Sequence, residues 1–441
     1  MTLLKRLEKY LFYAILFAIP LNLGKHYVFE FTYVYGKLID YLIPTIYVQD
    51  ILIFFLLLLA LPQLVKSVKK SISKRSMVFV FLVLFIVSVS FSVIDAFSFW
   101  PSLYAFLRLA LYVGFGFYVF SQRKFDEVFE GLSLIIAVLI LGLSLLGIAQ
   151  WLNQGSVFNN YLFFGEQPYS FSTPNIVKES LFGFTRVPPY GTFRHPNIFA
   201  GFLSFGLLVL IRRVLNGKGS WLIWVSFFGG LITLILTFSW MVFFSFLLSV
   251  FCLILLLRGR YYFNSQVWQW FKNKLPFVYL FFVFLVNVLF FLLSVRFSSP
   301  SISYRRNLLL MGVNLVKDNP LFLLFGVGFN NFTYFVDIQA ALLGFPKFTQ
   351  PIHNVYVLLL VESGIFALVF FAGFLIKLIL RLVVFLDQKE FPNKRRNASL
   401  LFILLLHLLL MGAFDHFLFT SHQIQLIFWL TVGFSLQYNL T

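Results

Sequence analysis

The sequence predicts an all-α polytopic integral membrane protein with about 12 transmembrane helices. Sixty per cent of the residues are hydrophobic, only 11% are charged, and the mean hydropathy is +0.91. These values lie far from those of soluble domains. Apolar stretches that approach the roughly 20 residues a helix needs to cross a bilayer recur along the whole chain. We therefore expect a single membrane domain over residues 1–441.

The expected spans follow one another with basic, aromatic or polar connections. They cover residues 9–24, 47–65, 77–94, 102–121, 128–151, 196–211, 220–237, 240–257, 276–295, 354–376, 398–414 and 423–439. The apolar block 220–257 is too long for one helix, so we expect a tight helical hairpin there. No small-x-small cleavage site follows the first apolar run, which we expect to remain as an uncleaved span.

The distribution of basic residues predicts the orientation. Most of the 34 lysines and arginines fall in the loops on the same side as the N-terminus, and such loops are cytoplasmic in multi-pass proteins. Both termini are therefore expected in the cytoplasm. The net charge of +18 is explained by this topology, so no nucleic-acid partner is expected. The lone cysteine, Cys252, excludes an intrachain disulfide and a cysteine zinc site.

The two long loops, 152–195 and 296–353, are then both extracytoplasmic. In the second loop Ser303 is a plausible N-cap for an amphipathic helix. The segment "DNP" should end that helix, "FGVGFNN" should turn, and a second short helix is expected at about 330–343. Arg305 and Arg306 would lie on the first turn, where the helix dipole repels cations and a bound anion would offset the cost.

The stretch "YGTFRHPNIFAG" opens the sixth expected span. Pro196 suits the first turn of a helix, and the free backbone amides of that turn attract anions. Arg186, Arg194 and His195 flank it, with Asn197 just inside. These residues predict a phosphate site at the membrane surface, although polar anchoring at the interface is the plainer interpretation.

Further ionisable residues lie in or near the later spans. His353 stands at the outer mouth of the tenth span, and Glu362 lies deeper in the same span. On a straight helix the two side chains point in opposite directions, so they cannot act as a dyad. Glu362 needs a partner within the bilayer and is more simply a structural hydrogen-bonding residue. Asp415 could orient His416, act as a base, or cap the last span.

Four segments in order resemble the O-antigen ligase and polymerase superfamily of bacterial membrane glycosyltransferases, over residues 186–430. They are "RVPPYGTFRHPNIFAG", "YRRNLLLMGVNLVKDNPLFLLFGVGFNNF", "HNVYVLLLVESGIFALVFF" and "FDHFLFTSHQIQLIFWL". Arg305 matches the arginine of the outer-loop block. One position departs from the pattern, because Trp240 follows Ser239 where the family usually has arginine.

The resemblance implies a GT-C-like fold in the bacterial cytoplasmic (inner) membrane. It implies a glycan donor linked to a polyprenyl diphosphate, usually undecaprenyl, drawn from the membrane lipid. The acceptor would be a hydroxyl of lipid A core (a ligase), of another lipid-linked repeat (a polymerase), of a protein or of a wall polymer. Such activity would build polysaccharide of the cell envelope, including lipopolysaccharide.

The residues suggest how this chemistry would proceed. Arginines bind phosphate oxygens in a bidentate manner, which assigns the diphosphate to Arg186, Arg305 and either Arg194 or Arg306. His353, if neutral near pH 7, would deprotonate the acceptor, or, if cationic, would stabilise the leaving group. Direct attack would invert the anomeric carbon. The supporting residues would be His195, Asn197, Glu362, Asp415 and His416.

The acidic residues of the outer loops are scattered, so metal-independent transfer without a cofactor is expected. The main alternative is a flippase for lipid-linked oligosaccharides, which would bind the diphosphate without chemistry. Such a transporter would place its cations between two repeated halves, and we find no internal repeat. A channel would carry polar residues in mid-span, whereas these spans are largely phenylalanine, leucine and valine.

Overall fold

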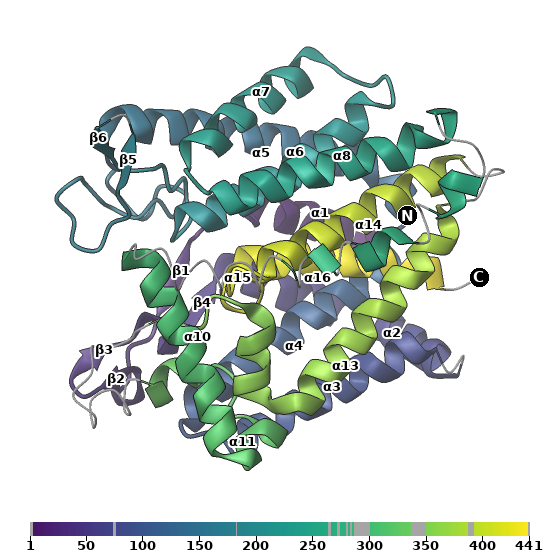
Figure 1. Ribbon diagram of the computed structural model, residues 1–441. Coiled ribbons are helices and arrows are strands. Elements are labelled where there is room, and N and C mark those ends of the chain that lie inside the picture. The colour runs from purple at the N-terminus through teal and green to yellow at the C-terminus, as the bar shows by residue number, and fades with distance from the viewer. Residues whose placement is uncertain are drawn as a thin grey trace.

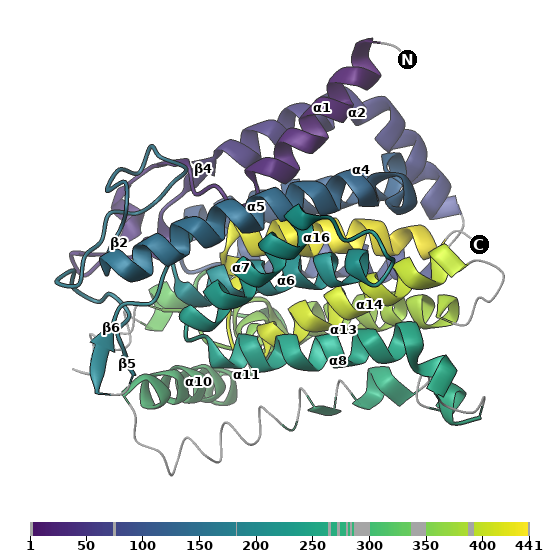
Figure 2. The same ribbon diagram turned by 90° about the horizontal axis from the view of Figure 1, so that it is seen from above.

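The computed structural model describes residues 3–73, 76–181, 183–262, 266–270, 274–278, 281–282, 285, 300–336, 350–386 and 392–439. The long helices run side by side as a bundle (Figures 1 and 2). Short helices and hairpins gather at one end of the bundle, and both termini lie at the other end. The termini thus share one side, as the charge pattern predicts.

Helices make up most of the described chain. They are α1 (Leu3–Ala18), α2 (Val48–Ser73), α3 (Met77–Ile94), α4 (Phe99–Gln122), α5 (Phe125–Asn153), α6 (Pro196–Val214), α7 (Trp221–Leu236), α8 (Trp240–Tyr262), α10 (Pro300–Asp318), α11 (Pro320–Phe325), α13 (Val355–Phe385), α14 (Pro392–Gly412), α15 (Phe417–Thr420) and α16 (His422–Leu436). Short 3-10 turns cover Glu30–Thr32, Asp40–Leu42 and Gln437–Asn439.

Eight helices in the described residues are long and apolar enough to cross a membrane: α2, α3, α4, α5, α6, α8, α13 and α14. Helix α7 is apolar but shorter. Helices α1 and α16, at 16 and 15 residues, occupy two further expected spans. The span expected at 276–295 lies largely outside the described residues. The polytopic helical class is therefore confirmed, whereas the count of 12 stays a prediction.

Three antiparallel pairs of short strands lie in the described loops, which the all-α expectation did not include. Strand β1 (Gly24–His26) pairs with β4 (Thr45–Tyr47), and β2 (Tyr33–Val34) pairs with β3 (Lys37–Leu38). Strand β5 (Glu179–Leu181) pairs with β6 (Phe184–Arg186). Strands of two or three residues are too short for a period-2 pattern to reveal them.

Helices α6, α14 and α16 form the centre of the bundle, because nearly all their residues are buried. Close packing depends on small residues: a Cβ added at Gly433 of α16 would lie 2.4 Å from the Gly116 carbonyl oxygen of α4. Buried polar contacts also join the helices. The His407 ring of α14 lies 2.8 Å from Ser204 Oγ on α6 and 3.1 Å from Ser249 Oγ on α8.

Helix α13 is interrupted at Gly364, which has φ 78° and ψ 177°, so it is not the straight helix assumed from the sequence. The break frees the carbonyls of Val361 and Glu362, and the amides of Val327 and Gly328 donate to them at 2.9 and 3.0 Å. The loop after α11 therefore packs into the interruption. Non-helical backbone at membrane depth is tolerated where other backbone satisfies it in this way.

The second long loop also differs from expectation. Helix α10 begins at Pro300 rather than after Ser303, in keeping with the preference of proline for the first turn. Arg305 is therefore in the second turn, where the dipole penalty is weaker. An unpredicted helix, α11, follows, with the Asn319 side chain accepting from the Leu321 amide. Of the helix expected at about 330–343, residues 330–336 fall within the described residues, and 332–336 of these are helical.

Candidate active site

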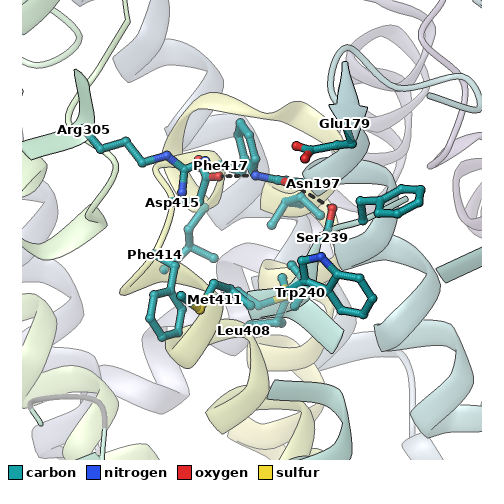
Figure 3. Close-up of a pocket in the computed structure, with 16 residues that line it drawn as sticks. Glu179, Asn197, Ser239, Trp240, Arg305, Leu408, Met411, Phe414, Asp415 and Phe417 are labelled. Atoms are coloured by element: carbon teal, nitrogen blue, oxygen red, sulfur yellow. Dashed lines mark hydrogen bonds between the residues drawn. The ribbon is translucent and has the colours of Figure 1, made fainter. Parts of the chain in front are cut away.

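A cavity of about 250 Å³ lies at the loop end of the bundle (Figure 3). Its apolar wall comes mainly from the first turn of α8 and the last turns of α14, with further residues from the segments that follow α14. Its polar lining residues are Glu179, Asn197, Ser239, Arg305 and Asp415. These five come from segments far apart in the sequence, so only the folded chain assembles them.

Asn197 connects two walls of the cavity. It lies in the first turn of α6, where Pro196 begins the helix as predicted and the His195 Nδ1 accepts from the Asn197 amide at 3.1 Å. Its side-chain Nδ2 donates to Asp415 Oδ2 at 3.2 Å, and its Oδ1 accepts from Ser239 Oγ at 2.8 Å. Asn197 is thereby held in one orientation by both neighbours.

A strained turn positions Ser239. Phe238 has φ 53°, a left-handed conformation that is rare for a bulky residue and marks a constrained position. Its ring stacks on Trp151 with centroids 5.5 Å apart and meets the edge of Trp240 at 6.0 Å. The turn thus fixes the hydroxyl of Ser239 and the indole of Trp240 at the rim of the cavity.

Asp415 is buried between α14 and α15, where its Oδ1 accepts from the His416 amide at 2.8 Å. Burial raises the pKa of Asp415 to about 6, while the charge of Arg305 and the hydrogen bond from Asn197 act in the opposite direction. Arg305 extends from α10 toward this carboxyl group (Figure 3). Asp415 is therefore more basic than an ordinary aspartate and faces the cavity.

His353 and His416 lie behind Asp415, with ring centroids 4.9 Å apart. Burial holds the pKa of both rings well below the usual range, and Arg305 acts in the same direction. Both rings are thus neutral near pH 7. His416 Nδ1 contacts Thr420 Oγ1 at 2.7 Å, whereas the buried Nδ1 of His353 has no partner among the described residues.

One atom from each of His353, Asp415 and His416 lies within 4.8 Å of the others. Neutral imidazoles and a carboxylate are suitable ligands for a divalent metal, and the contact of His416 with Thr420 resembles the outer hydrogen bonds of metal-binding histidines. The charge of Arg305, however, acts on all three groups and opposes a second cation. The cluster therefore has suitable ligands and an unfavourable local charge.

Of the four predicted diphosphate arginines, Arg305 lines this cavity and the other three do not. Among the described residues that line the cavity, Arg305 is the one arginine. Arg186 lies exposed on β6, opposite Glu179 in strand register, and Arg306 is not a lining residue. Arg194 contacts Nε2 of His26, on β1, at 2.8 Å. The structure thus places Arg305 at this cavity, and the shared cradle of four arginines stays a prediction.

Glu362 does not reach the cavity. Its carboxylate accepts from the amides of Asn330 and Phe332 at 3.0 and 3.2 Å, and it is buried. It therefore holds the loop after α11, in agreement with the structural interpretation of this residue. Glu179 was missed from the sequence, because it lies in a loop without a motif and reaches the cavity only through the β5–β6 hairpin.

The fold and the site together define a class: a polytopic helical membrane protein whose loop end carries an arginine, two carboxylates and neutral histidines beside a partly apolar cavity. The family model described as O-antigen ligase matches residues 197–372, from Asn197 into α13. Over these residues the chain is similar to the O-antigen ligase family, which supports the resemblance to the O-antigen ligase and polymerase superfamily. The match supports O-antigen ligase-type glycan transfer in general. A search of curated proteins found no match to the chain.

Proposed function

We propose that the protein transfers a glycan from a polyprenyl-diphosphate-linked donor to an acceptor hydroxyl at the outer face of the cytoplasmic membrane. One observation carries this proposal. Arg305 lines the same cavity as three hydrogen-bonded residues, Asp415, Asn197 and Ser239. A cation for the leaving diphosphate and a basic group for the acceptor thereby line the same cavity (Figure 3).

Arg305 would bind the diphosphate. As the anomeric bond breaks, negative charge grows on the leaving oxygen, so a fixed guanidinium stabilises the transition state more than the ground state. Its planar fork of donors suits phosphate oxygens. Its position in the second turn of α10, on a helix packed against α13, supports a preorganised rather than a mobile contact.

Asp415 would accept the proton of the acceptor hydroxyl. It lines the cavity, whereas His353 does not, and a base works best when its pKa is near the operating pH. The pKa of Asp415, raised by burial to about 6, meets that condition, while the lowered pKa of His353 makes its ring a weak base. The neutral His353, which has a ring nitrogen within 4.8 Å of an Asp415 oxygen, would keep Asp415 oriented.

The acceptor oxygen would attack the anomeric carbon directly, on the face opposite the diphosphate, and so invert its configuration. We propose that Arg305 replaces a divalent cation in this step. The apolar wall supports a lipid tail: Met241 lines the cavity and is 45% exposed on the outside of α8. A polyprenyl chain can therefore leave the cavity toward lipid.

The test uses the purified full chain in detergent with undecaprenyl-diphosphate-linked glycan extracted from cells that encode the protein. Product is followed by mass spectrometry with lipid A core, lipid-linked glycan and wall polymer as separate acceptors. We expect a new glycoconjugate and release of undecaprenyl diphosphate with one of them. A flippase needs a sealed membrane and yields no product in detergent, so binding without any product would favour that alternative.

A further inference from the structure

Glu179 differs from the other polar residues of the cavity. It is an exposed residue of β5 whose carboxylate points into the cavity (Figure 3). Among the described residues it makes no hydrogen bond and no ion pair, whereas Asn197, Ser239 and Asp415 are joined to one another. An accessible carboxylate without a partner is an acceptor available to a ligand.

The charge of the lining sets the direction in which a substrate can bind. Two carboxylates, Glu179 and Asp415, face one arginine across the cavity. A diphosphate is repelled by carboxylates and attracted by Arg305, so it belongs at the Arg305 side. Whatever lies against Glu179 must instead offer hydrogen-bond donors, and a sugar ring offers hydroxyl groups.

Trp240 lies on the same side of the cavity as Glu179 (Figure 3). Its ring is held edge-on by Phe238 at 6.0 Å and by Phe243 at 6.2 Å, yet it is 48% exposed. The indole therefore presents a rigid apolar surface beside a carboxylate. This combination matches a sugar, which has apolar C–H faces and a rim of hydroxyl groups.

We propose that Glu179 and Trp240 form the subsite for the sugar that is bonded to the donor diphosphate. Glu179 accepts hydrogen bonds from its hydroxyls, and the indole packs against its face. This inference rests on the proposed function and adds the orientation of the donor, with the diphosphate at Arg305 and the sugar at Glu179. The cavity, with a volume of about 250 Å³, lies below the roughly 300–1,000 Å³ of drug-sized sites, which favours recognition of this first sugar rather than of a longer glycan.

The experiment compares two lipids on the full chain in detergent, undecaprenyl diphosphate and its glycan-linked form from cells that encode the protein. Binding is measured by native mass spectrometry and transfer by product formation. Glu179→Ala should weaken binding of the glycan-linked lipid about tenfold or more, the usual effect of losing a hydrogen bond to a charged group. Binding of undecaprenyl diphosphate should not weaken. Glu179→Gln, which keeps one acceptor oxygen, should lose less.

Trp240→Ala should show the same selectivity, and Trp240→Phe should retain most of the binding. Ser180→Ala, at the exposed neighbouring position of β5, is the matched control and should behave like the wild type. Equal effects of Glu179→Ala on both lipids, or none on either, would overturn the subsite. The proposed function fails separately: the wild-type chain would then form no product although it binds the lipid.

Discussion

Asn197 and Asp415, 218 residues apart, are joined by a hydrogen bond of 3.2 Å across the cavity. The same amide accepts from Ser239, so the start of α6 fixes the carboxylate that follows α14. Replacing Asn197 with alanine removes a hydrogen bond to a charged group, worth about 1.5–3 kcal/mol. We expect a loss of transfer of roughly 10- to 150-fold, measured as kcat/KM. Ser239→Ala, which leaves the bond to Asp415 intact, should lose much less.

The pH dependence of transfer follows from Asp415. Burial raises the pKa of its carboxyl group to about 6, and only the ionised form can accept a proton. kcat/KM should therefore rise with pH through about 6 and level off above it. The hydrogen bond from Asn197 lowers this pKa, so in Asn197→Ala the midpoint should move to higher pH. A midpoint that stays in place would show that another group titrates.

Arg305 should matter far more than its neighbour. Arg305→Ala removes the cation of the cavity, and loss of one transition-state donor costs about 100- to 1,000-fold in kcat. Arg306→Ala and Arg186→Ala change arginines that do not line the cavity, and we expect less than about a threefold effect on transfer. Equal losses for all three variants would restore the shared arginine cradle expected from the sequence.

Variants of His353 test whether this residue orients Asp415, the proposed base. If it orients Asp415, His353→Ala should lower kcat while KM for the donor changes little, and the pH midpoint should shift. His353→Gln, which keeps a polar group there, should recover part of the rate. An unchanged rate for both variants would remove this residue from the mechanism.

Chelation tests whether the cluster formed by His353, Asp415 and His416 binds a divalent metal ion or acts without one. The charge of Arg305 beside these groups leads us to expect the same rate before and after treatment with EDTA. Metal content of the purified protein is the companion measurement. A loss of activity that zinc or manganese restores would instead assign a divalent ion to these three residues.

The sequence predicted those features that depend on local chemistry. Long apolar stretches indicate most helices, and Pro196 marks the start of α6. Residue type and motif alone also point to Asn197, Arg305 and Asp415, which all line the cavity. Their meeting in one cavity could not be derived, because it depends on how α6, α8, α10 and α14 pack. The structure of the long loops was the least predictable part of the chain. Glu179 reaches the cavity through a three-residue strand that no periodicity reveals.

Glu362 and Gly364 show how a motif can be structural. From the sequence, a carboxylate within a span suggests function by default. In the fold it accepts two backbone amides of the loop after α11, and the glycine two positions later breaks the helix against that loop. The segment from His353 to Gly364 therefore contains both a residue near the candidate site and residues that hold the fold together. Only the contacts in the structure tell the two kinds apart.

The interruption of α13 should be essential for stability. A Cβ added at Gly364 would lie 2.0 Å from the Leu324 carbonyl oxygen, and its φ of +78° disfavours side chains. Gly364→Ala should lower the unfolding temperature in detergent, because a non-glycine residue held in such a conformation costs about 1–3 kcal/mol before any clash. Gly142→Ala is the matched control. Nothing lies within 4 Å of a Cβ built there in α5, so it should stabilise by about 0.5–1 kcal/mol. Equal unfolding temperatures for the two variants would mean that the loop and the broken helix do not depend on each other.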